Sequence, residues 1–167
     1  IMLSEFLYLQ SLGLEPSLSD NGLYAYMGSL FQMNVIAYRD FFFAHPPVHY
    51  LFAVIAGFFK DKTYMVAQTI HAVATMLAAW FSYRIFKAHC SPILATLYFV
   101  FFLFNHHMLI NASGFVGIHL AVMFFMMALY DALKHRVVTS ALWAMLSLGS
   151  GIYMLPSLVI LLWLLSW

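Results

Sequence analysis

Hydrophobic residues run in long stretches along the chain, and charged residues interrupt them at only a few places. Four windows contain no Asp, Glu, Lys or Arg: 41–59, 63–83, 88–130 and 137–167. A helix needs about 20 apolar residues to cross roughly 30 Å of hydrocarbon, so 63–83 suits one crossing and 88–130 suits two. This pattern predicts an all-α protein, built as a polytopic transmembrane helix bundle.

Polar residues and glycines indicate where the longer windows divide. Asn105-His106-His107 and Asn111-Ala112-Ser113-Gly114 interrupt the first, while Gly149-Ser150-Gly151 and Pro156 favour two short helices in the last. We therefore expect a loop segment, 1–62, followed by a transmembrane segment, 63–167. The transmembrane helices are expected at about 63–86, 91–110, 113–133, 137–150 and 152–167.

The window 41–59 is expected not to cross the membrane. It contains His45-Pro46-Pro47, and proline is tolerated in the first turn of a helix but not in its interior. A helix that starts there and ends at Lys60 has about 13 residues and rises only about 20 Å. We expect it to lie in the membrane interface, with Lys60-Asp61-Lys62 as its hydrated end.

Composition excludes several other classes of protein. The chain is 65% hydrophobic and 8% charged, with a mean hydropathy of +0.91, whereas a soluble domain is about one quarter charged. The same composition excludes a disordered tail. It also excludes a nucleic-acid-binding protein, because no basic surface is available to meet phosphate. The single cysteine, Cys90, excludes a disulfide framework and a cysteine-rich zinc site.

The distribution of charge predicts which side of the membrane each segment faces. Residues 1–62 carry three basic and five acidic residues, whereas 63–167 carry four basic residues and one acidic residue. Lys and Arg concentrate in short cytoplasmic loops, and two crossings separate the pair Arg84 and Lys87 from the pair Lys134 and Arg136. These basic loops are therefore expected to be cytoplasmic and residues 1–62 extracytoplasmic.

Residues with chemical potential concentrate in the loop segment. Asp20 either caps a short helix or acts as a general base at the membrane surface. Arg39 either forms a solvated pair with Asp40 or binds a lipid phosphate. His45 and His49 are four residues apart and could share one helical face; a divalent metal, with Asp20 or Asp40 as a third ligand, is an open alternative. In the spans, His71 and His119 are interpreted as hydrogen-bonded residues between helices.

Two motifs, whose Asp20 and His-Pro-Pro step are about 25 residues apart, resemble a known family. Asp20-Asn21-Gly22-Leu23-Tyr24-Ala25-Tyr26-Met27-Gly28 and Tyr38-Arg39-Asp40-Phe41-Phe42-Phe43-Ala44-His45-Pro46-Pro47 are similar to the first extracytoplasmic loop of GT-C glycosyltransferases. The resemblance is to the family 39 branch, the dolichyl-phosphate-mannose protein mannosyltransferases, together with the ArnT-like enzymes. It implies transfer of a sugar, with inversion, from a polyprenyl-phosphate carrier to an extracytoplasmic acceptor.

The resemblance also implies roles for particular residues. Asp20 matches the loop aspartate of the family and would act as the base or orient the acceptor hydroxyl. The residues expected to contact substrate are Arg39, Asp40, His45, His49 and Gln68. Gln68 and Gly151 stand where members often carry basic residues, and Asn21 where an acidic residue often follows the aspartate. These departures favour the alternative of a catalytically inactive scaffold; a transporter that uses His71 and His119 is a further alternative.

The expected surroundings follow from this reading. The partners are the lipid bilayer, a polyprenyl-phosphate-linked sugar donor and a lipid, glycan or protein acceptor, with no nucleic acid. The location would be the cell membrane or the endoplasmic reticulum membrane. Because the sequence starts at Ile1 and stops inside apolar residues at Trp167, we expect it to be the N-terminal part of a longer protein.

Overall fold

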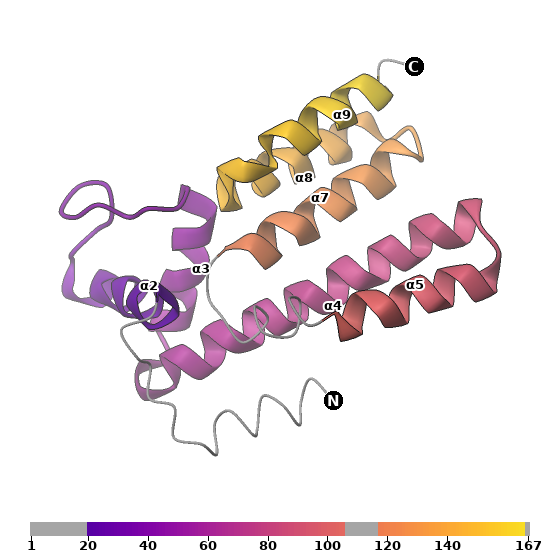
Figure 1. The fold of residues 1–167 in the computed structure, drawn as a ribbon. Coiled ribbons are helices and arrows are strands. Elements are labelled where there is room, and N and C mark those ends of the chain that lie inside the picture. The colour runs from indigo at the N-terminus through magenta and orange to yellow at the C-terminus, as the bar shows by residue number, and fades with distance from the viewer. Residues whose placement is uncertain (1–19, 106–116, 166–167) are drawn as a thin grey trace.

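The computed structural model describes residues 20–105 and 117–165, and this part of the chain is all-α, as predicted (Figure 1). It contains seven α-helices and three short 3-10 turns. The α-helices are α2 (Asp20–Ser29), α3 (Pro47–Gly57), α4 (Thr63–His89), α5 (Pro92–Phe104), α7 (Ile118–Ala132), α8 (Val137–Ser150) and α9 (Leu155–Leu165). The 3-10 turns are η1 (Leu30–Met33), η2 (Lys60–Lys62) and η3 (Ile152–Met154).

The helices begin and end close to where the charge-free windows predict. Helix α4 extends three residues beyond the expected end at 86, and α8 has the bounds expected for it. Helix α5 ends at Phe104 rather than near 110, and α7 begins at Ile118 rather than 113. The polar stretch expected to separate them falls in residues 106–116, outside the described residues, apart from Asn105.

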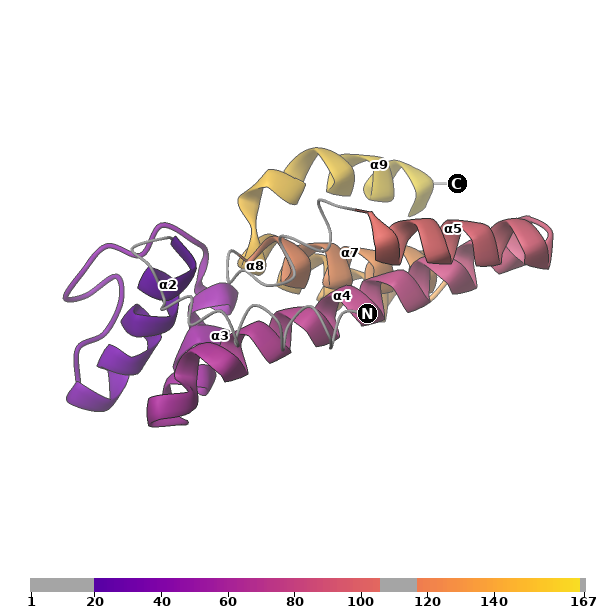
Figure 2. The same ribbon diagram turned by 60° about the horizontal axis from the view of Figure 1, so that its bottom comes forward.

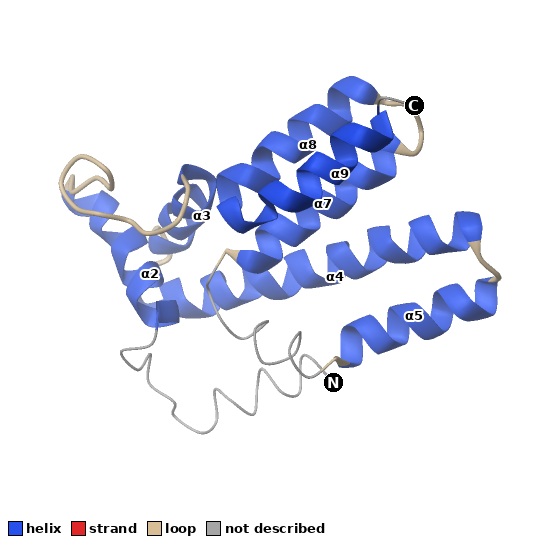
Figure 3. Cartoon of the chain, turned by 45° about the horizontal axis from the view of Figure 1, so that its top comes forward, coloured by secondary structure: helices blue, strands red, loops and turns tan. Residues whose placement is uncertain are grey.

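Helix α4 organises the rest of the molecule. Its 27 residues span about 40 Å, with α2 and α3 packed near its N-terminal end and α5 folded back alongside it (Figures 1 and 2). The α7–α8 hairpin packs on α4 through α7, and α9 lies against α7 and α8 (Figure 3). Ser91 caps α5 by accepting a hydrogen bond from the backbone N–H of Leu94, at 3.3 Å.

The buried face of α4 is made of small and polar residues, and its large apolar residues point outward. The buried residues are Ala67, Gln68, His71, Ala74, Thr75, Ala78, Ala79 and Ser82. Val73, Met76, Leu77 and Trp80 are instead exposed. A helix at the surface of a soluble domain shows the reverse arrangement, whereas small interfacial residues are typical of helices that pack in lipid.

The α7–α8 hairpin is joined by hydroxyl groups that bond to backbone carbonyls. The Ser140 hydroxyl donates to the Ala128 carbonyl at 2.9 Å, and the Ser147 hydroxyl donates to the Ala121 carbonyl at 2.8 Å. All three serines of α8 that face inward, Ser140, Ser147 and Ser150, are buried. The hairpin therefore uses the same combination of short side chains and interhelical hydrogen bonds as α4.

Only one helix among the described residues is long and apolar enough to cross a membrane, the run Lys60–His89 formed by η2 and α4. The other apolar helices are shorter: Pro47–Gly57, Pro92–Phe104, Ile118–Ala132, Val137–Ser150 and Ile152–Trp163. Helix α3 has 11 residues and spans about 16 Å, which is even less than the length expected for it. The described residues thus supply one candidate span, and the polytopic arrangement stays a prediction.

Helices α2 and α3 cross so closely that a glycine is needed at the contact. A Cβ atom added at Gly28 would overlap the carbonyl oxygen and carbon of Ala53. Ala53 is itself fully buried, and backbone atoms cannot rotate away as the end of a side chain can. This close crossing therefore fixes the position of α2 relative to α3.

We predict that Gly28→Ala destabilises the protein. In an unconstrained helix interior this change stabilises by about 1 kcal/mol, but the overlap with Ala53 is expected to reverse the sign and cost about 2 kcal/mol. Thermal unfolding of the purified protein in detergent measures the effect. Ser29→Ala, which removes only the exposed hydroxyl bonded to the Tyr26 carbonyl, is the control. A Gly28→Ala variant at least as stable as wild type would show that the helices do not cross as described.

Candidate functional site

Asp20 is the first residue of α2. Its side chain, like residues 1–19, lies outside the described part of the structure, so its proposed role stays a prediction. Tyr24 lies one turn further along α2, and its ring is buried.

The His-Pro-Pro sequence forms the corner that leads into α3. Pro47 is the first residue of the helix, and Pro46 is extended, with φ −62° and ψ 163°. The expectation that His45 and His49 share a helical face is wrong, because His45 precedes the helix. The two rings nevertheless meet edge to face, with centroids 4.7 Å apart and planes at 88°. The turn at the prolines, rather than helical periodicity, brings them together.

Tyr24 joins this corner to α2. Its ring lies edge-on to His45, with centroids 4.6 Å apart, and also contacts His49 at 5.5 Å and Phe43 at 5.3 Å. The Tyr38 hydroxyl donates to the His45 carbonyl, which ties the loop between α2 and α3 to the same place. The two motifs that carry the family resemblance therefore contact each other.

Arg39 and Asp40 form an ion pair on the exposed part of this loop. Arg39 Nη2 and Asp40 Oδ2 are 2.7 Å apart, and Arg39 Nε also donates to both carboxylate oxygens, at 3.0 and 3.1 Å. Asp40 further accepts from the Ile36 N–H at 2.8 Å. The hydrogen bonds from Arg39 and from this backbone N–H hold the pKa of Asp40 below its usual range. The expectation of a solvated pair is confirmed, and a phosphate would have to compete with Asp40 for Arg39.

A line of buried imidazole rings continues from His49 into the helix bundle. The His49 ring lies 6.1 Å from His71 on α4, and the His71 ring lies 5.8 Å from His119 on α7. His119 Nδ1 and the Thr75 hydroxyl are 2.8 Å apart. The interpretation of His119 as a hydrogen-bonded residue between helices is confirmed, and the line as a whole connects α3, α4 and α7.

Gln68 lies on the buried face of α4, one turn before His71. Its side chain is 5% exposed and hydrogen-bonds to Tyr64. The structure thus separates the predicted substrate residues into an exposed group, Arg39 and Asp40, and a buried group that includes His49 and Gln68. Whether any of them contacts a substrate stays a prediction.

The described residues contain no group of three or more His, Cys, Asp or Glu side chains that could hold a metal ion. Of the ligands considered for a divalent metal, His45 and His49 are adjacent, but Asp40 is bonded to Arg39. The side chain of Asp20, the other carboxylate considered, is not among those described. In this geometry the His49 ring contacts aromatic side chains, which favours a packing role for His49 over the role of a metal ligand.

His49 is held neutral by its surroundings. It is fully buried against Tyr24 and Phe43, and the beginning of α7 closes over it: a Cβ added at Gly117, where φ is +76°, would lie 3.1 Å from the ring. Burial, and secondarily the neighbouring His45, lowers the pKa of His49 to about 3. At neutral pH its imidazole can accept or donate a hydrogen bond but carries no charge.

The sequence predicts the two motifs but not the residues that connect them. Tyr24 and Phe43 lie within the two motifs, but the sequence assigns no role to them or to Gly117, because an aromatic residue or glycine in an apolar chain is ordinary. His71 and His119 were noted as intramembrane histidines, and that signal points to the line they form. Known protein families, curated proteins and solved structures were compared with this chain, and none matches it.

We predict a pH-dependent contribution of His49 to stability. Its folded pKa of about 3 is below its unfolded value of 6.5, so the stability it contributes is complete above pH 6.5 and is lost as the unfolded state binds a proton at lower pH. The loss should reach about 3 kcal/mol at pH 4.

Thermal unfolding in detergent between pH 7 and pH 4, for wild type and His49→Asn, measures this contribution. The wild type should lose more stability than the variant over this interval, so the difference between them changes with pH. Carboxylates that titrate in the same range affect both proteins equally. A difference that stays constant across the interval would mean that His49 is not held neutral.

Proposed function

We propose that this chain belongs to a multi-pass membrane glycosyltransferase that transfers a sugar from a polyprenyl-phosphate carrier to an extracytoplasmic acceptor. The observation that carries the proposal is the contact of Tyr24 on α2 with His45 and His49 at the beginning of α3. It brings the helix headed by Asp20 to the His-Pro-Pro corner, so both motifs contribute to one place.

The distribution of side chains supports placement in a membrane. On α4 and α7 four alanines, Ala67, Ala79, Ala121 and Ala128, are fully buried. On α5 and α8 large apolar residues such as Ile93, Phe101 and Val138 are between 69% and 75% exposed. Water would penalise exposed apolar surface of this extent, because burying it is worth about 25 cal/mol per Å². Lipid does not penalise it, so the arrangement favours a bundle surrounded by hydrocarbon.

The arrangement of charge supports the proposed orientation. Arg84 and Lys87 at the C-terminal end of α4 and Lys134 at the end of α7 line one cavity. The basic residues of the two turns are therefore close together in space, as a shared cytoplasmic side requires. The α2–α3 region packs near the other end of α4 (Figure 1), which supports an extracytoplasmic position for the candidate site.

In the proposed reaction, Asp20 orients or deprotonates the acceptor hydroxyl, which attacks the anomeric carbon as the carrier phosphate leaves. A single displacement of this kind inverts the anomeric configuration. The neutral His49 ring and the aromatic rings packed against it give the α2–α3 region an apolar interior, and a lipid-linked donor requires a site beside apolar surroundings at the bilayer surface. Arg39 is the cation of this loop available to the phosphate, provided that the phosphate replaces Asp40.

We predict that Asp20→Asn lowers sugar transfer at least about 100-fold, because the amide cannot accept the hydroxyl proton. The assay uses the full-length protein and a polyprenyl-phosphate-linked sugar donor. Asp61→Asn, which removes the same charge from η2 at the same end of α4, should transfer sugar as wild type does. Unchanged transfer by Asp20→Asn would remove the proposed role, and no transfer by wild type would favour the inactive scaffold.

The orientation makes a separate prediction about cysteine labelling. Cys90 is exposed in the turn between α4 and α5, and Phe42 is 81% exposed in the loop before α3. In intact cells a membrane-impermeant maleimide should label a Phe42→Cys, Cys90→Ser variant but not native Cys90. Cys90 should react after the membrane is permeabilised. The opposite order would contradict the orientation, and equal labelling in intact cells would contradict the membrane crossing between them.

A further inference from the structure

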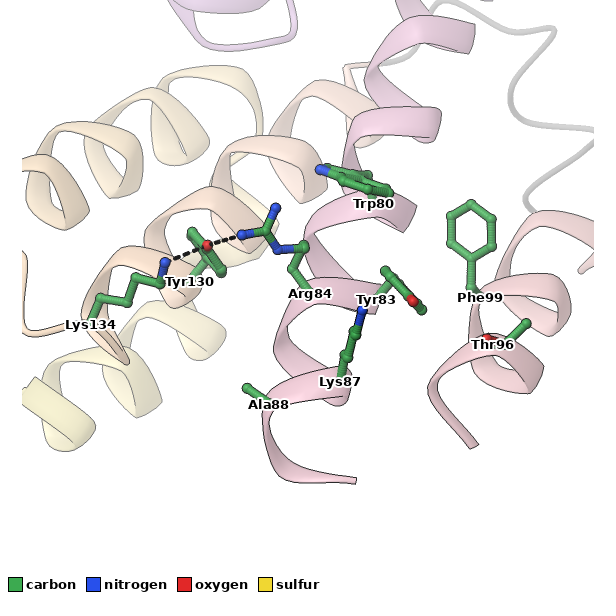
Figure 4. A pocket seen from close by; sticks show the side chains of 9 residues that line it. All are labelled: Trp80, Tyr83, Arg84, Lys87, Ala88, Thr96, Phe99, Tyr130 and Lys134. Atoms are coloured by element: carbon green, nitrogen blue, oxygen red, sulfur yellow. Dashed lines mark hydrogen bonds between the residues drawn. The ribbon is translucent and has the colours of Figure 1, made fainter. Parts of the chain in front are cut away.

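A cavity of about 710 Å³ lies between the ends of α4, α5 and α7, at the opposite end of α4 from the α2–α3 region (Figure 4). Three basic side chains line it: Arg84 and Lys87 from α4 and Lys134 from the turn after α7. None of the described residues that line it is acidic. The proposed sugar transfer assigns no role to these side chains.

The nearest acidic residue along α7 is already bonded elsewhere. Asp131 is buried, accepts a hydrogen bond from Trp143 Nε1 at 3.2 Å and lies 3.7 Å from Arg136 Nη1. Neither Asp131 nor Arg136 lines the cavity. The three positive charges therefore face the cavity without a carboxylate among the residues that surround them, which favours an anionic ligand.

A tyrosine holds two of the cations in place. The Tyr130 hydroxyl accepts hydrogen bonds from Arg84 Nη2 at 2.9 Å and from Lys134 Nζ at 2.6 Å, as Figure 4 shows. Since both bonds use the oxygen as an acceptor, the hydroxyl proton stays available to donate. Arg84 and Lys134 also lie over the Tyr130 ring, at 5.6 and 4.3 Å, so their positions are fixed before a ligand arrives.

Further aromatic rings place the remaining charges. Arg84 lies 5.8 Å from the centre of the Trp80 ring, and Lys87 lies 5.7 Å from that of Tyr83. Such contacts attract the cation to the ring face and leave the N–H groups able to bond to oxygen atoms. The result is an arrangement of cationic and hydroxyl donors that matches the several oxygens of one phosphate group.

We propose that this cavity binds the phosphate group of an anionic ligand, and specifically of an anionic phospholipid headgroup. The two helices that form its walls continue as exposed apolar surface, with Leu77 on α4 and Leu97 and Val100 on α5 all more than one third exposed. Acyl chains of a lipid can cover this surface while the headgroup occupies the basic end. Basic pockets between transmembrane helices on the cytoplasmic side bind anionic headgroups in this way.

Thermal unfolding of the purified full-length protein in detergent tests the proposal. Phosphatidylglycerol is added in one titration, phosphatidylcholine in a second and inorganic phosphate in a third, at constant ionic strength. Wild type should be stabilised by phosphatidylglycerol and not by phosphatidylcholine. Stabilisation by phosphatidylglycerol alone identifies a lipid headgroup as the ligand. Stabilisation by inorganic phosphate as well supports the phosphate site and identifies a soluble phosphate as a competing source. Stabilisation by neither anion overturns the proposal.

Three variants show whether the effect arises at the cavity. Arg84→Gln with Lys134→Gln should weaken the apparent affinity for phosphatidylglycerol at least 10-fold. Lys60→Gln with Lys62→Gln removes the same charge from η2 and should leave the affinity unchanged. Tyr130→Phe, which keeps the ring and removes only the bridging hydroxyl, gives a milder variant that should also weaken binding. Equal losses in the cavity and η2 variants would overturn the proposal, because the effect would then be one of net charge.

Discussion

The close approach of other helices to α4 is the constraint on which the rest of the structure depends. The inward face of α4 carries four alanines that are at most 1% exposed: Ala67, Ala74, Ala78 and Ala79. With so little side-chain volume at the contact, α3 and α7 come near enough for His71 and Thr75 to meet His49 and His119. In the proposed membrane bundle, where apolar association gains little, such short-range packing and hydrogen bonding would hold the helices together.

The same face of α4 couples packing to the candidate chemistry. Replacing an alanine there with a larger residue would separate α7 from α4 and open the space around His71. His49 would then lose the neighbours that exclude water, and its pKa would move back toward 6.5. The neutrality of His49 thus depends mainly on how the helices pack around it, with the nearby His45 as a secondary cause.

The sequence predicts the ends of several helices well, because the charged residues and glycines that mark a helix end act at their own positions in the chain. The charge-free window and the flanking Lys62 and Arg84 define the core of α4, and Gly149-Ser150-Gly151 ends α8 where predicted. The position of His45 before α3 follows from local sequence. A residue that precedes proline is disfavoured in the helical region, and both His45 and Pro46 precede one. The contacts of Tyr24 with His45 and of His49 with His71 depend instead on crossing geometry set by Gly28 and by the alanines of α4, so periodicity alone does not reveal them.

The charged side chains near the two ends of α4 have different partners, and this difference distinguishes the two proposed sites. Near the N-terminal end, Arg39 in the loop between α2 and α3 is paired with Asp40, and the buried His49 is neutral. A ligand phosphate there must displace a carboxylate, which suits a donor that binds and leaves during a reaction. At the C-terminal end, Arg84, Lys87 and Lys134 are held by aromatic rings and one hydroxyl. An anion can bind there without breaking an ion pair, which suits a ligand that stays bound.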